Sequence, residues 1–192
     1  MKEPNKKIRI AVIGAGWFGC HIGYNLIKKK FKVEIFEKEN DIFQNASGNN
    51  TNRLHLGFHY PRSFQTRKMS IDGYKKFMKQ YPQLSRPLKN NIYVIAKSKL
   101  NKMSSNLYEK SMLRSNLSFS KLDIKKTDLV NVNKIFNTNE KGIDHKKAKK
   151  FFKKRLKKHI FLNKNITSIK KINNKFKIEN KIYDFVINCS YQ

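Results

Sequence analysis

The sequence predicts an α/β fold built on a parallel β-sheet, and three observations carry this prediction. Residues 8–13 form a β-branched run that is too apolar for an exposed edge and too short for a helix, which indicates a buried parallel strand. A glycine-rich turn follows at once, and a helical pattern then extends to about Lys30. Residues 31–36 alternate as a second strand, which completes a β-α-β unit.

The turn has the pattern G-x-G-x-x-G, with glycines at positions 14, 16 and 19. In a β-α-β unit the first glycine makes the tight turn, the second lets a pyrophosphate approach the backbone, and the third lets the helix pack on the strand. Gly23 lies one helical turn further and extends this small-residue face. The pattern predicts a Rossmann-like dinucleotide-binding fold. A chance glycine cluster in a surface loop is the alternative, which the flanking strand and helix disfavour.

An acidic residue, Glu37, stands at the end of the second predicted strand, 21 residues after Gly16. An acidic side chain about 20 residues beyond the glycines accepts hydrogen bonds from a ribose 2′-OH and repels a 2′-phosphate. The unit therefore favours FAD or NAD over NADP.

The chain has 192 residues, enough for one sizeable domain, and a net charge of +30. A basic surface can neutralise nucleic-acid phosphates. However, only seven of the 43 basic residues are Arg, whose forked guanidinium is favoured for hydrogen bonding to phosphates and to base edges. The Lys residues are scattered along the chain. We interpret the charge as a solvated surface that binds polyanions nonspecifically, with no specific nucleic-acid partner.

The cysteines and the apolar runs bear on where the protein works. Cys20 and Cys189 both fall in apolar contexts, which predicts reduced, buried thiols and a cytoplasmic protein. The apolar run after the charged N-terminus has six residues, so no signal peptide is expected. No stretch approaches the roughly 20 apolar residues of a transmembrane segment, and no metal-ligand spacing such as C-x₂-C occurs.

A long polar segment at residues 40–62 has no clear period, a feature typical of functional loops. Leu54, Leu56 and Phe58 alternate within it as if packing one face. A helix is predicted over residues 63–80, with Ser63 as its N-cap and an apolar side formed by Met69, Tyr74, Phe77 and Met78.

The remaining elements are predicted from local patterns. A strand is expected at 91–97, a helix at 99–116, and a second helix at 145–158 with Asp144 as its N-cap and Ala148, Phe151, Phe152 and Leu156 on its apolar face. Residues 117–139 have no assignable pattern. Short strands are expected at 159–162, 166–172, 176–179 and 183–189, with a turn at Asn173-Asn174. Residues 184–189 look like a further central parallel strand.

Three segments together resemble the FAD-dependent oxidoreductases of the D-amino-acid-oxidase (DAO) type, most closely the L-2-hydroxyglutarate dehydrogenase branch. The first is the glycine turn with Gly23 and Glu37. The second, residues 46–61, resembles the family's Ser-rich loop with a central Asn, followed by H-x-G-x-x-Y. The third, residues 142–189, is similar to the second segment of the family's FAD domain. The resemblance covers nearly the whole chain but only the N-terminal part of a family member.

The resemblance implies FAD as the cofactor. The amides of the glycine turn and the following helix would hold the pyrophosphate, with added hydrogen bonds from Ser47 and Asn50. The candidate cofactor-binding residues are Gly14, Ala15, Gly16, Trp17, Phe18, Gly19, Glu37, Lys38, Ser47, Asn50, Ile166 and Cys189. His55 is the candidate for the flavin face or for proton handling, and Arg62 for binding a substrate carboxylate. The alternative for His55 and His59 is a packed loop position with no part in the chemistry.

The implied function is FAD-dependent oxidation of a small amino or hydroxy acid by hydride transfer to the flavin. Residues 1–192 are expected to form an FAD-binding domain with its dinucleotide-binding core at about 6–62 and 140–192. Residues 63–139 would be an insertion that contributes part of a substrate or cap region. The expected partners are a small-molecule substrate and a second chain that supplies the missing C-terminal half of the family fold. The alternatives are an inactive or split FAD-binding half and an NAD-binding Rossmann domain.

Overall fold

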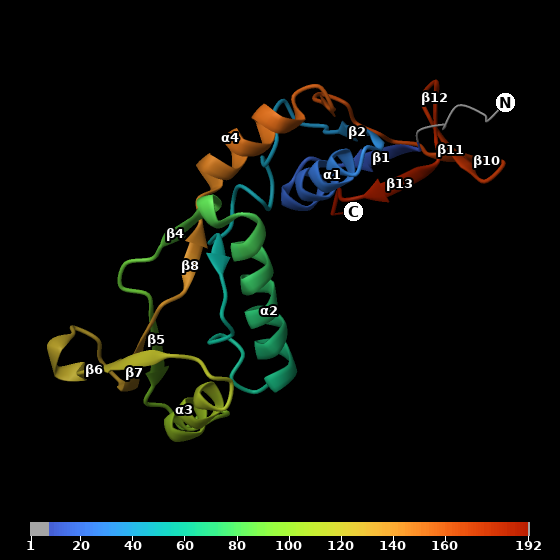
Figure 1. The fold of residues 1–192 in the computed structure, drawn as a ribbon. Coiled ribbons are helices and arrows are strands. Elements are labelled where there is room, and N and C mark those ends of the chain that lie inside the picture. The colour runs from blue at the N-terminus through green and yellow to red at the C-terminus, as the bar shows by residue number, and fades with distance from the viewer. Residues whose placement is uncertain (1–7, 192) are drawn as a thin grey trace. The chain divides into compact units, whose positions relative to one another are not determined.

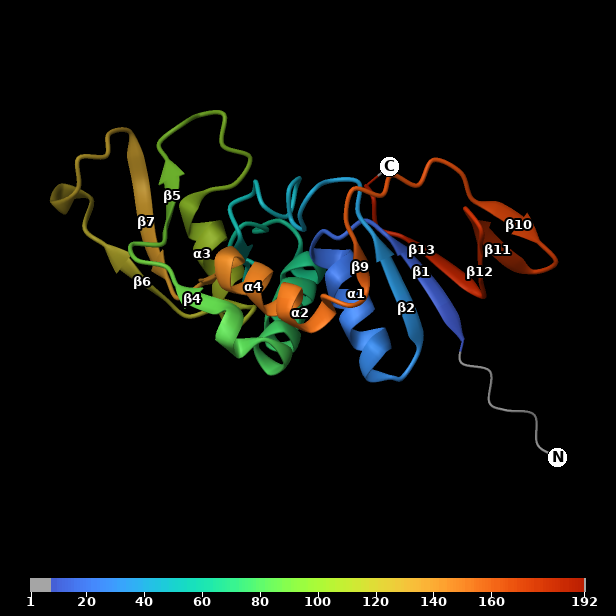
Figure 2. The ribbon, with the colours of Figure 1, turned by 90° about the horizontal axis from the view of Figure 1, so that it is seen from above.

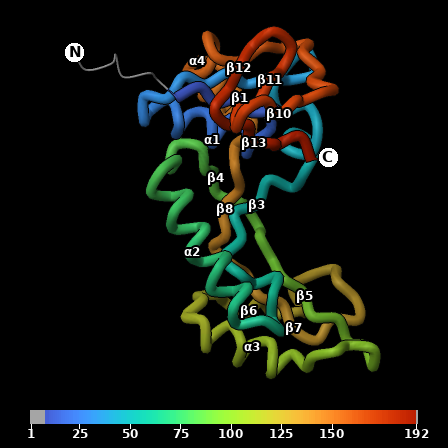
Figure 3. Tube along the Cα trace, turned by 90° about the vertical axis from the view of Figure 1, so that its right-hand side faces the viewer, coloured from blue at the N-terminus to red at the C-terminus, as the bar shows by residue number. Residues whose placement is uncertain are grey.

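The computed structural model describes residues 8–191. Residues 1–7, on which the signal-peptide prediction depends, and residue 192 lie outside the described residues. The chain divides into two units, and unit 2 is Thr51–Asp144. Unit 1 combines the described residues up to Asn50 with those from His145 onward, so its blue and orange-to-red segments are far apart in sequence (Figure 3).

The core of unit 1 is a four-stranded parallel sheet in the order β13-β1-β2-β9. Its strands are β1 (Arg9–Ile13), β2 (Lys32–Phe36), β9 (Ile160–Phe161) and β13 (Phe185–Asn188). Ala11, Val12 and Ile35 are fully buried, which confirms the prediction of buried parallel strands. The prediction that the last strand is central is wrong among the described residues: β13 pairs only with β1, and its Phe185 side chain is 55% exposed.

Two helices accompany this sheet. Helix α1 (Trp17–Lys28) lies beside β1 and β2 (Figure 2). It packs closely because Gly23 has no side chain: a Cβ there would lie 2.5 Å from Ile35 Cδ1. Helix α4 (His145–Leu156) buries Ala148, Phe152 and Leu156, as its sequence period predicts, and the Phe152 ring meets Trp17 of α1 edge-on at 5.5 Å.

A small antiparallel sheet follows in unit 1, as predicted. It consists of β10 (Lys170–Ile172), β11 (Lys175–Ile178) and β12 (Lys181–Tyr183). Asn173 and Asn174 both have positive φ, 45° and 61°, as a two-residue type I′ turn requires. The strand predicted at 183–189 divides at Asp184, whose carboxylate accepts the backbone N–H of Arg9 at 2.8 Å.

Unit 2 contains two three-stranded antiparallel sheets, in the orders β3-β8-β4 and β5-β7-β6 (Figure 1). The strands are β3 (Arg53–Leu54), β4 (Ser85–Pro87), β5 (Ile92–Ala96), β6 (Phe119–Leu122), β7 (Val132–Thr138) and β8 (Lys141–Ile143). The helices are α2 (Phe64–Gln80) and α3 (Ser105–Leu113), with short 3₁₀ turns η1 (Pro82–Leu84) and η2 (Ile124–Lys126).

The core of unit 2 is largely aromatic. Its buried residues include Phe58, Tyr108 and Phe136, and the last two rings stack at 5.1 Å. The unassigned region 117–139 supplies β6 and β7; consecutive residues Ile135 and Phe136 are both buried, so β7 lacks the alternation that marks a half-exposed strand.

Two predictions about the helices of unit 2 need correction. The helix expected at 99–116 begins only at Ser105, because the Ser104 hydroxyl accepts the Leu107 N–H and caps it there. Helix α2 begins where predicted, with Ser63 accepting the Thr66 N–H. Met69 is not on a buried face, however, since 64% of it is exposed.

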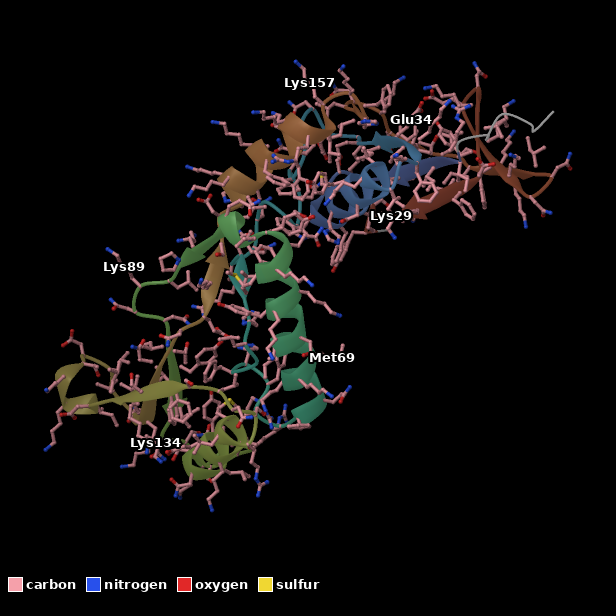
Figure 4. The ribbon with its side chains drawn as sticks, viewed as in Figure 1. Lys29, Glu34, Met69, Lys89, Lys134 and Lys157 are labelled. Carbon is pink, nitrogen blue, oxygen red and sulfur yellow. The ribbon has the colours of Figure 1, made fainter. Side chains whose placement is uncertain are left out.

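The lysines that dominate the charge lie mainly at the surface. Lys29, Lys89 and Lys157 are exposed and project from their segments (Figure 4). Within the described part of the chain, no helix is both long and apolar enough to span a membrane.

Candidate functional site

The first glycine of the turn occupies a backbone conformation that other residues rarely adopt. Gly14 has φ +95° and donates its N–H to Phe36 O of β2 at 2.7 Å. A Cβ on Gly14 would lie 2.7 Å from Cys189 O, just beyond β13. The turn therefore depends on glycine both for its φ and for the close approach of two strand ends.

The other two glycines bring the start of α1 close to its neighbours. A Cβ on Gly19 would lie 1.9 Å from Gly14 O, so glycine is required for the helix to pack against the turn. Gly16 is the N-cap of α1, and a Cβ there would lie 3.0 Å from Ser47 Oγ. The same hydroxyl oxygen accepts the Trp17 N–H at 2.8 Å. Gly16, Trp17 and Ser47 thus meet at the helix start.

This helix terminus is suited to an anion. The first-turn amides of a helix have no intrahelical acceptor, and the helix dipole favours negative charge there. The first turn of α1, which lies within the described residues, contains no acidic side chain. The Phe18 side chain is 73% exposed, whereas Ala15 is buried.

Glu37 lies at the carboxyl end of β2 and is buried. Its Oε2 accepts the Ala15 N–H at 2.7 Å, and its Oε1 accepts the Glu39 N–H at 3.1 Å. Each carboxylate oxygen can accept more than one hydrogen bond, so these contacts leave acceptor capacity. The carboxylate is held directly beside the glycine turn.

A cavity of about 90 Å³ lies at the carboxyl ends of β1 and β2 and just beyond β13, the edge where open α/β sheets bind ligands. Five predicted cofactor residues line it: Gly14, Glu37, Lys38, Ile166 and Cys189. Asn50 lies in a local turn, where its side-chain amide donates to Ala46 O at 2.6 Å. The glycine turn has no Cβ atoms at positions 14, 16 and 19, and such a backbone allows the close approach that a dinucleotide's pyrophosphate requires.

Both cysteines are free, as predicted. Cys20 is buried, and its thiol donates to Ala15 O at 3.4 Å; Cys189 is only half-buried. Burial raises the pKa of both thiols, so both favour the protonated form.

The predicted catalytic candidates lie in unit 2. His55 is half-buried, with its ring 5.8 Å from that of His59 and 6.4 Å from that of Tyr60. Arg62 is exposed, just before α2.

Sequence reasoning missed a carboxylate that faces the His55 imidazole. Glu140 is buried, and its Oε1 lies 3.8 Å from His55 Nδ1. Its Oε2 accepts the Tyr93 O–H at 2.7 Å. The available signal was weak: Glu140 is one of only 13 acidic residues and directly follows a stretch without an assignable pattern.

Arg67 was also missed, and it organises the loop that carries the histidines. It is buried in α2 and donates to Tyr60 O at 3.0 Å and to Pro61 O at 2.7 Å. Gly57, at φ +108°, packs on it, since a Cβ there would lie 3.0 Å from Arg67 Cα. Burial lowers the pKa of Arg67.

A larger cavity, of about 630 Å³, lies along α4 and contains none of the predicted site residues. Lysines of α4 line it together with Asp41, which pairs with Lys149 at 2.9 Å and Lys153 at 3.0 Å. Within residues 8–191, no group of His, Cys, Asp or Glu side chains is arranged to hold a metal ion.

Comparison with known proteins agrees with this geometry. The family model for FAD dependent oxidoreductase (DAO) matches residues 9–190. The FAD-dependent monooxygenase FPY4 of Fusarium mangiferae is 34% identical over 95% of this chain and 49% of its own length. The mitochondrial L-2-hydroxyglutarate dehydrogenase of Dictyostelium discoideum is 34% identical over 34% of this chain and 15% of its own length.

A solved structure shares the fold. L-α-glycerophosphate oxidase from Mycoplasma pneumoniae, with FAD bound, superposes with a TM-score of 0.72 at 18% identity, covering 94% of this chain and 52% of that one. The chain thus spans at most about half the length of the curated relatives it matches. The family match selects FAD over NAD as the cofactor. The chain belongs to the DAO family of FAD dependent oxidoreductases.

Proposed function

We propose that this chain supplies the FAD-binding part of an enzyme that oxidises a small amino or hydroxy acid. The observation that carries the proposal is the convergence of the glycine turn, Ser47 and Glu37 at the carboxyl end of the parallel sheet. A helix N-terminus, a hydroxyl and a carboxylate are the groups that a dinucleotide's pyrophosphate and ribose require.

Different residues at the turn would bind different parts of the cofactor. The amides of residues 16–19 would bind the pyrophosphate, with the Trp17 N–H acting through Ser47, to which it donates. Ser47 would add a hydrogen bond, because its oxygen accepts from Trp17 while its O–H remains able to donate. Glu37 would accept from the ribose hydroxyls. The remaining candidates would line the rest of the cofactor's path: Gly14, Ala15, Lys38, Asn50, Ile166 and Cys189.

Bound FAD supplies the acceptor for a hydride from the substrate carbon that carries the hydroxyl or amine. As that C–H bond breaks, the proton on the hydroxyl or amine must also leave. His55 would take it, since imidazole titrates near neutrality. Arg62, whose guanidinium is exposed, would pair with the substrate carboxylate.

We propose that unit 1 is the dinucleotide-binding core and that unit 2 contributes part of the substrate or cap region. Hydride transfer depends on near-attack geometry within about an ångström, which one domain alone rarely secures. We therefore propose that turnover needs the half of the relatives' length that this chain does not match, in the same polypeptide or as a second chain. The free cysteines support a cytoplasmic location as part of this proposal.

The test is to purify the 192-residue chain, measure bound FAD, and follow substrate-dependent dye reduction with 2-hydroxy and 2-amino acids. Alone, the chain should bind FAD weakly and show no turnover. Joined to or co-expressed with the C-terminal half of a family member, it should hold FAD tightly and reduce dye.

Gly16→Val should abolish FAD binding in either form, because a side chain at this position would block the pyrophosphate; its Cβ would also lie 3.0 Å from Ser47 Oγ. Stoichiometric FAD and sustained turnover by the chain alone would refute the need for a second half. Tight FAD binding without turnover in the completed protein would favour the inactive-half alternative.

The relative FPY4 supports a second candidate, a monooxygenase, because it is 34% identical over 95% of this chain. The two candidates differ in the fate of oxygen. An oxidase or dehydrogenase of amino or hydroxy acids releases a product without an oxygen atom derived from O₂, whereas a monooxygenase incorporates one such atom into its product. Mass spectrometry of product formed under ¹⁸O₂ separates them.

A further inference from the structure

Glu140 is a buried carboxylate in the short connection between β7 and β8. Its side chain has no exposed area. Oε1 accepts the Leu56 N–H at 2.7 Å, and Oε2 accepts the Tyr93 O–H at 2.7 Å, with the Asn91 amide at 3.5 Å. Groups from β5, and from the loop that carries His55, therefore surround a charge that is costly to bury unless it is well partnered.

The imidazole of His55 faces this carboxylate through one nitrogen. Nδ1 lies 3.8 Å from Glu140 Oε1, within ion-pair distance and beyond a hydrogen bond. This nitrogen is buried and has no hydrogen-bond partner among the described residues. A carboxylate accepts hydrogen bonds only, so it favours a proton on Nδ1. In the neutral ring, Nε2 then carries the lone pair that can receive a proton.

The surrounding charges are consistent with an ionised Glu140. Burial raises the pKa of Glu140, but the contacts with His55, Tyr93 and the Leu56 N–H outweigh it and hold this pKa below its ordinary value. The positive charge of Arg53 favours a lower pKa for Tyr93, whereas the negative charge of Glu140 favours a higher pKa for Tyr74 and Tyr108. Each of these tyrosines has a raised pKa, first because of burial and then because of Glu140, so they stay neutral near pH 7.

We propose that Glu140 is a positioning residue for His55: its buried carboxylate fixes the Nδ1–H tautomer and so presents Nε2 as the proton acceptor. The contact with His55 stands on the geometry alone, while its value for catalysis rests on the proposed function above. The arrangement is that of a histidine base oriented by a carboxylate on its other ring nitrogen.

The contact is tested without substrate or cofactor by ¹⁵N NMR of the histidine rings of the full chain, with His55→Gln to assign the signal. Wild-type His55 should show the Nδ1–H tautomer when neutral. In Glu140→Gln, whose amide no longer demands a donor, the signal should move towards the Nε2–H form that free histidine side chains favour. An Nε2–H tautomer in the wild type, or no change in Glu140→Gln, overturns the proposal.

Two variants separate the carboxylate from general damage. Glu109→Gln makes the same chemical change on α3 of unit 2, where the carboxylate pairs with Lys121 and with Lys134, and should leave the His55 tautomer unchanged. Figure 4 labels Lys134. Tyr93→Phe removes one hydrogen-bond donor to Glu140 but keeps the negative charge of Glu140. It should also leave the His55 tautomer unchanged. If Glu140→Gln does not fold, a second experiment uses His55→Gln and follows the Glu140 carboxyl by ¹³C NMR as the pH is changed. This carboxyl should titrate at higher pH in His55→Gln than in the wild type. An unchanged titration overturns the contact.

The catalytic role is tested in the completed, FAD-loaded protein. Glu140→Gln should lower the rate of substrate-dependent flavin reduction on the order of 10–100-fold, with KM little changed. A changed tautomer with an unchanged rate would overturn the positioning role. If the wild type neither binds FAD nor turns over, the proposed function fails, and the NMR result alone decides on the contact.

Discussion

The carboxylate of Glu37 accepts the backbone N–H of Ala15 at 2.7 Å, so the residue expected to recognise the ribose also fastens the glycine turn to the end of β2. The same side chain accepts the Glu39 N–H at 3.1 Å. One carboxylate therefore links the strand, the turn and the expected cofactor position. Substitutions at Glu37 should affect folding and binding by different amounts, which makes the two roles separable.

Glu37→Ala should weaken FAD binding about tenfold, the loss of one charge-assisted hydrogen-bond pair at about 1.4 kcal/mol per decade. It should also lower the free energy of unfolding of the FAD-free chain by about 1–3 kcal/mol, because the Ala15 N–H loses its buried acceptor. Glu37→Gln keeps an oxygen for that N–H and should lose affinity with a smaller loss of stability. FAD titration and urea unfolding measure the two effects. Unchanged FAD affinity in both variants would contradict the ribose assignment.

Gly14→Ala should destabilise the protein by about 1–3 kcal/mol, because φ is +95° and the new Cβ would lie 2.7 Å from Cys189 O. Gly73→Ala is the matched control. Gly73 lies within α2 and nothing is within 4 Å of its Cβ position, so alanine there should stabilise by about 0.5–1 kcal/mol. Thermal or urea unfolding of the pair should give opposite signs, and the same sign for both would show that the turn tolerates a side chain.

The glycines of the turn and of α1 illustrate what the sequence could predict. The roles of Gly14, Gly19 and Gly23 follow from local spacing, and the structure places each where a Cβ would collide. Glu37 was also predictable, because its distance from the glycines is set by one strand and one helix. Local patterns of this kind predict the structure correctly because the β-α-β unit is contiguous in the sequence.

Contacts between distant segments were not predictable in the same way. Glu140 reaches Leu56 across 84 positions of the chain, and its place depends on how β7 and β8 run in unit 2. Arg67 was hidden for another reason: arginine on a helix is normally solvated, and its burial is tolerable here because it donates to the carbonyls of Tyr60 and Pro61 and to the Ser115 hydroxyl. Neither position has a sequence period that marks it.

Acid should destabilise unit 1 through Glu34 (Figure 4). Burial raises the pKa of Glu34, but hydrogen bonds from Tyr183 and Lys181 outweigh it and hold the pKa below the ordinary value. A depressed folded-state pKa means that the unfolded chain binds the proton more readily, so this contribution is present above the unfolded pKa of roughly 4.3 and is lost as pH falls through the folded pKa.

Glu34→Gln should therefore flatten the fall in stability below about pH 4.3, measured by urea unfolding across pH. The effect should be modest, because Glu34 is partly exposed and solvent screens it. Glu179→Gln is the control, since Glu179 is exposed and its carboxylate lies 3.9 Å from Lys164. Equal acid profiles for wild type and Glu34→Gln would show that Glu34 does not carry this pH dependence.

Ser47→Ala tests whether the hydroxyl at the start of α1 serves the cofactor as well as the helix. Removing it deprives the Trp17 N–H of its acceptor and should cost about 0.5–2 kcal/mol of stability. Ser63→Ala makes the same structural change in unit 2, where the hydroxyl caps α2 by accepting the Thr66 N–H, and should cost a similar amount. Because only Ser47 lies beside Gly16, FAD affinity should fall about tenfold in Ser47→Ala and stay unchanged in Ser63→Ala. Equal FAD affinities for the two variants would mean that Ser47 acts as a helix cap alone.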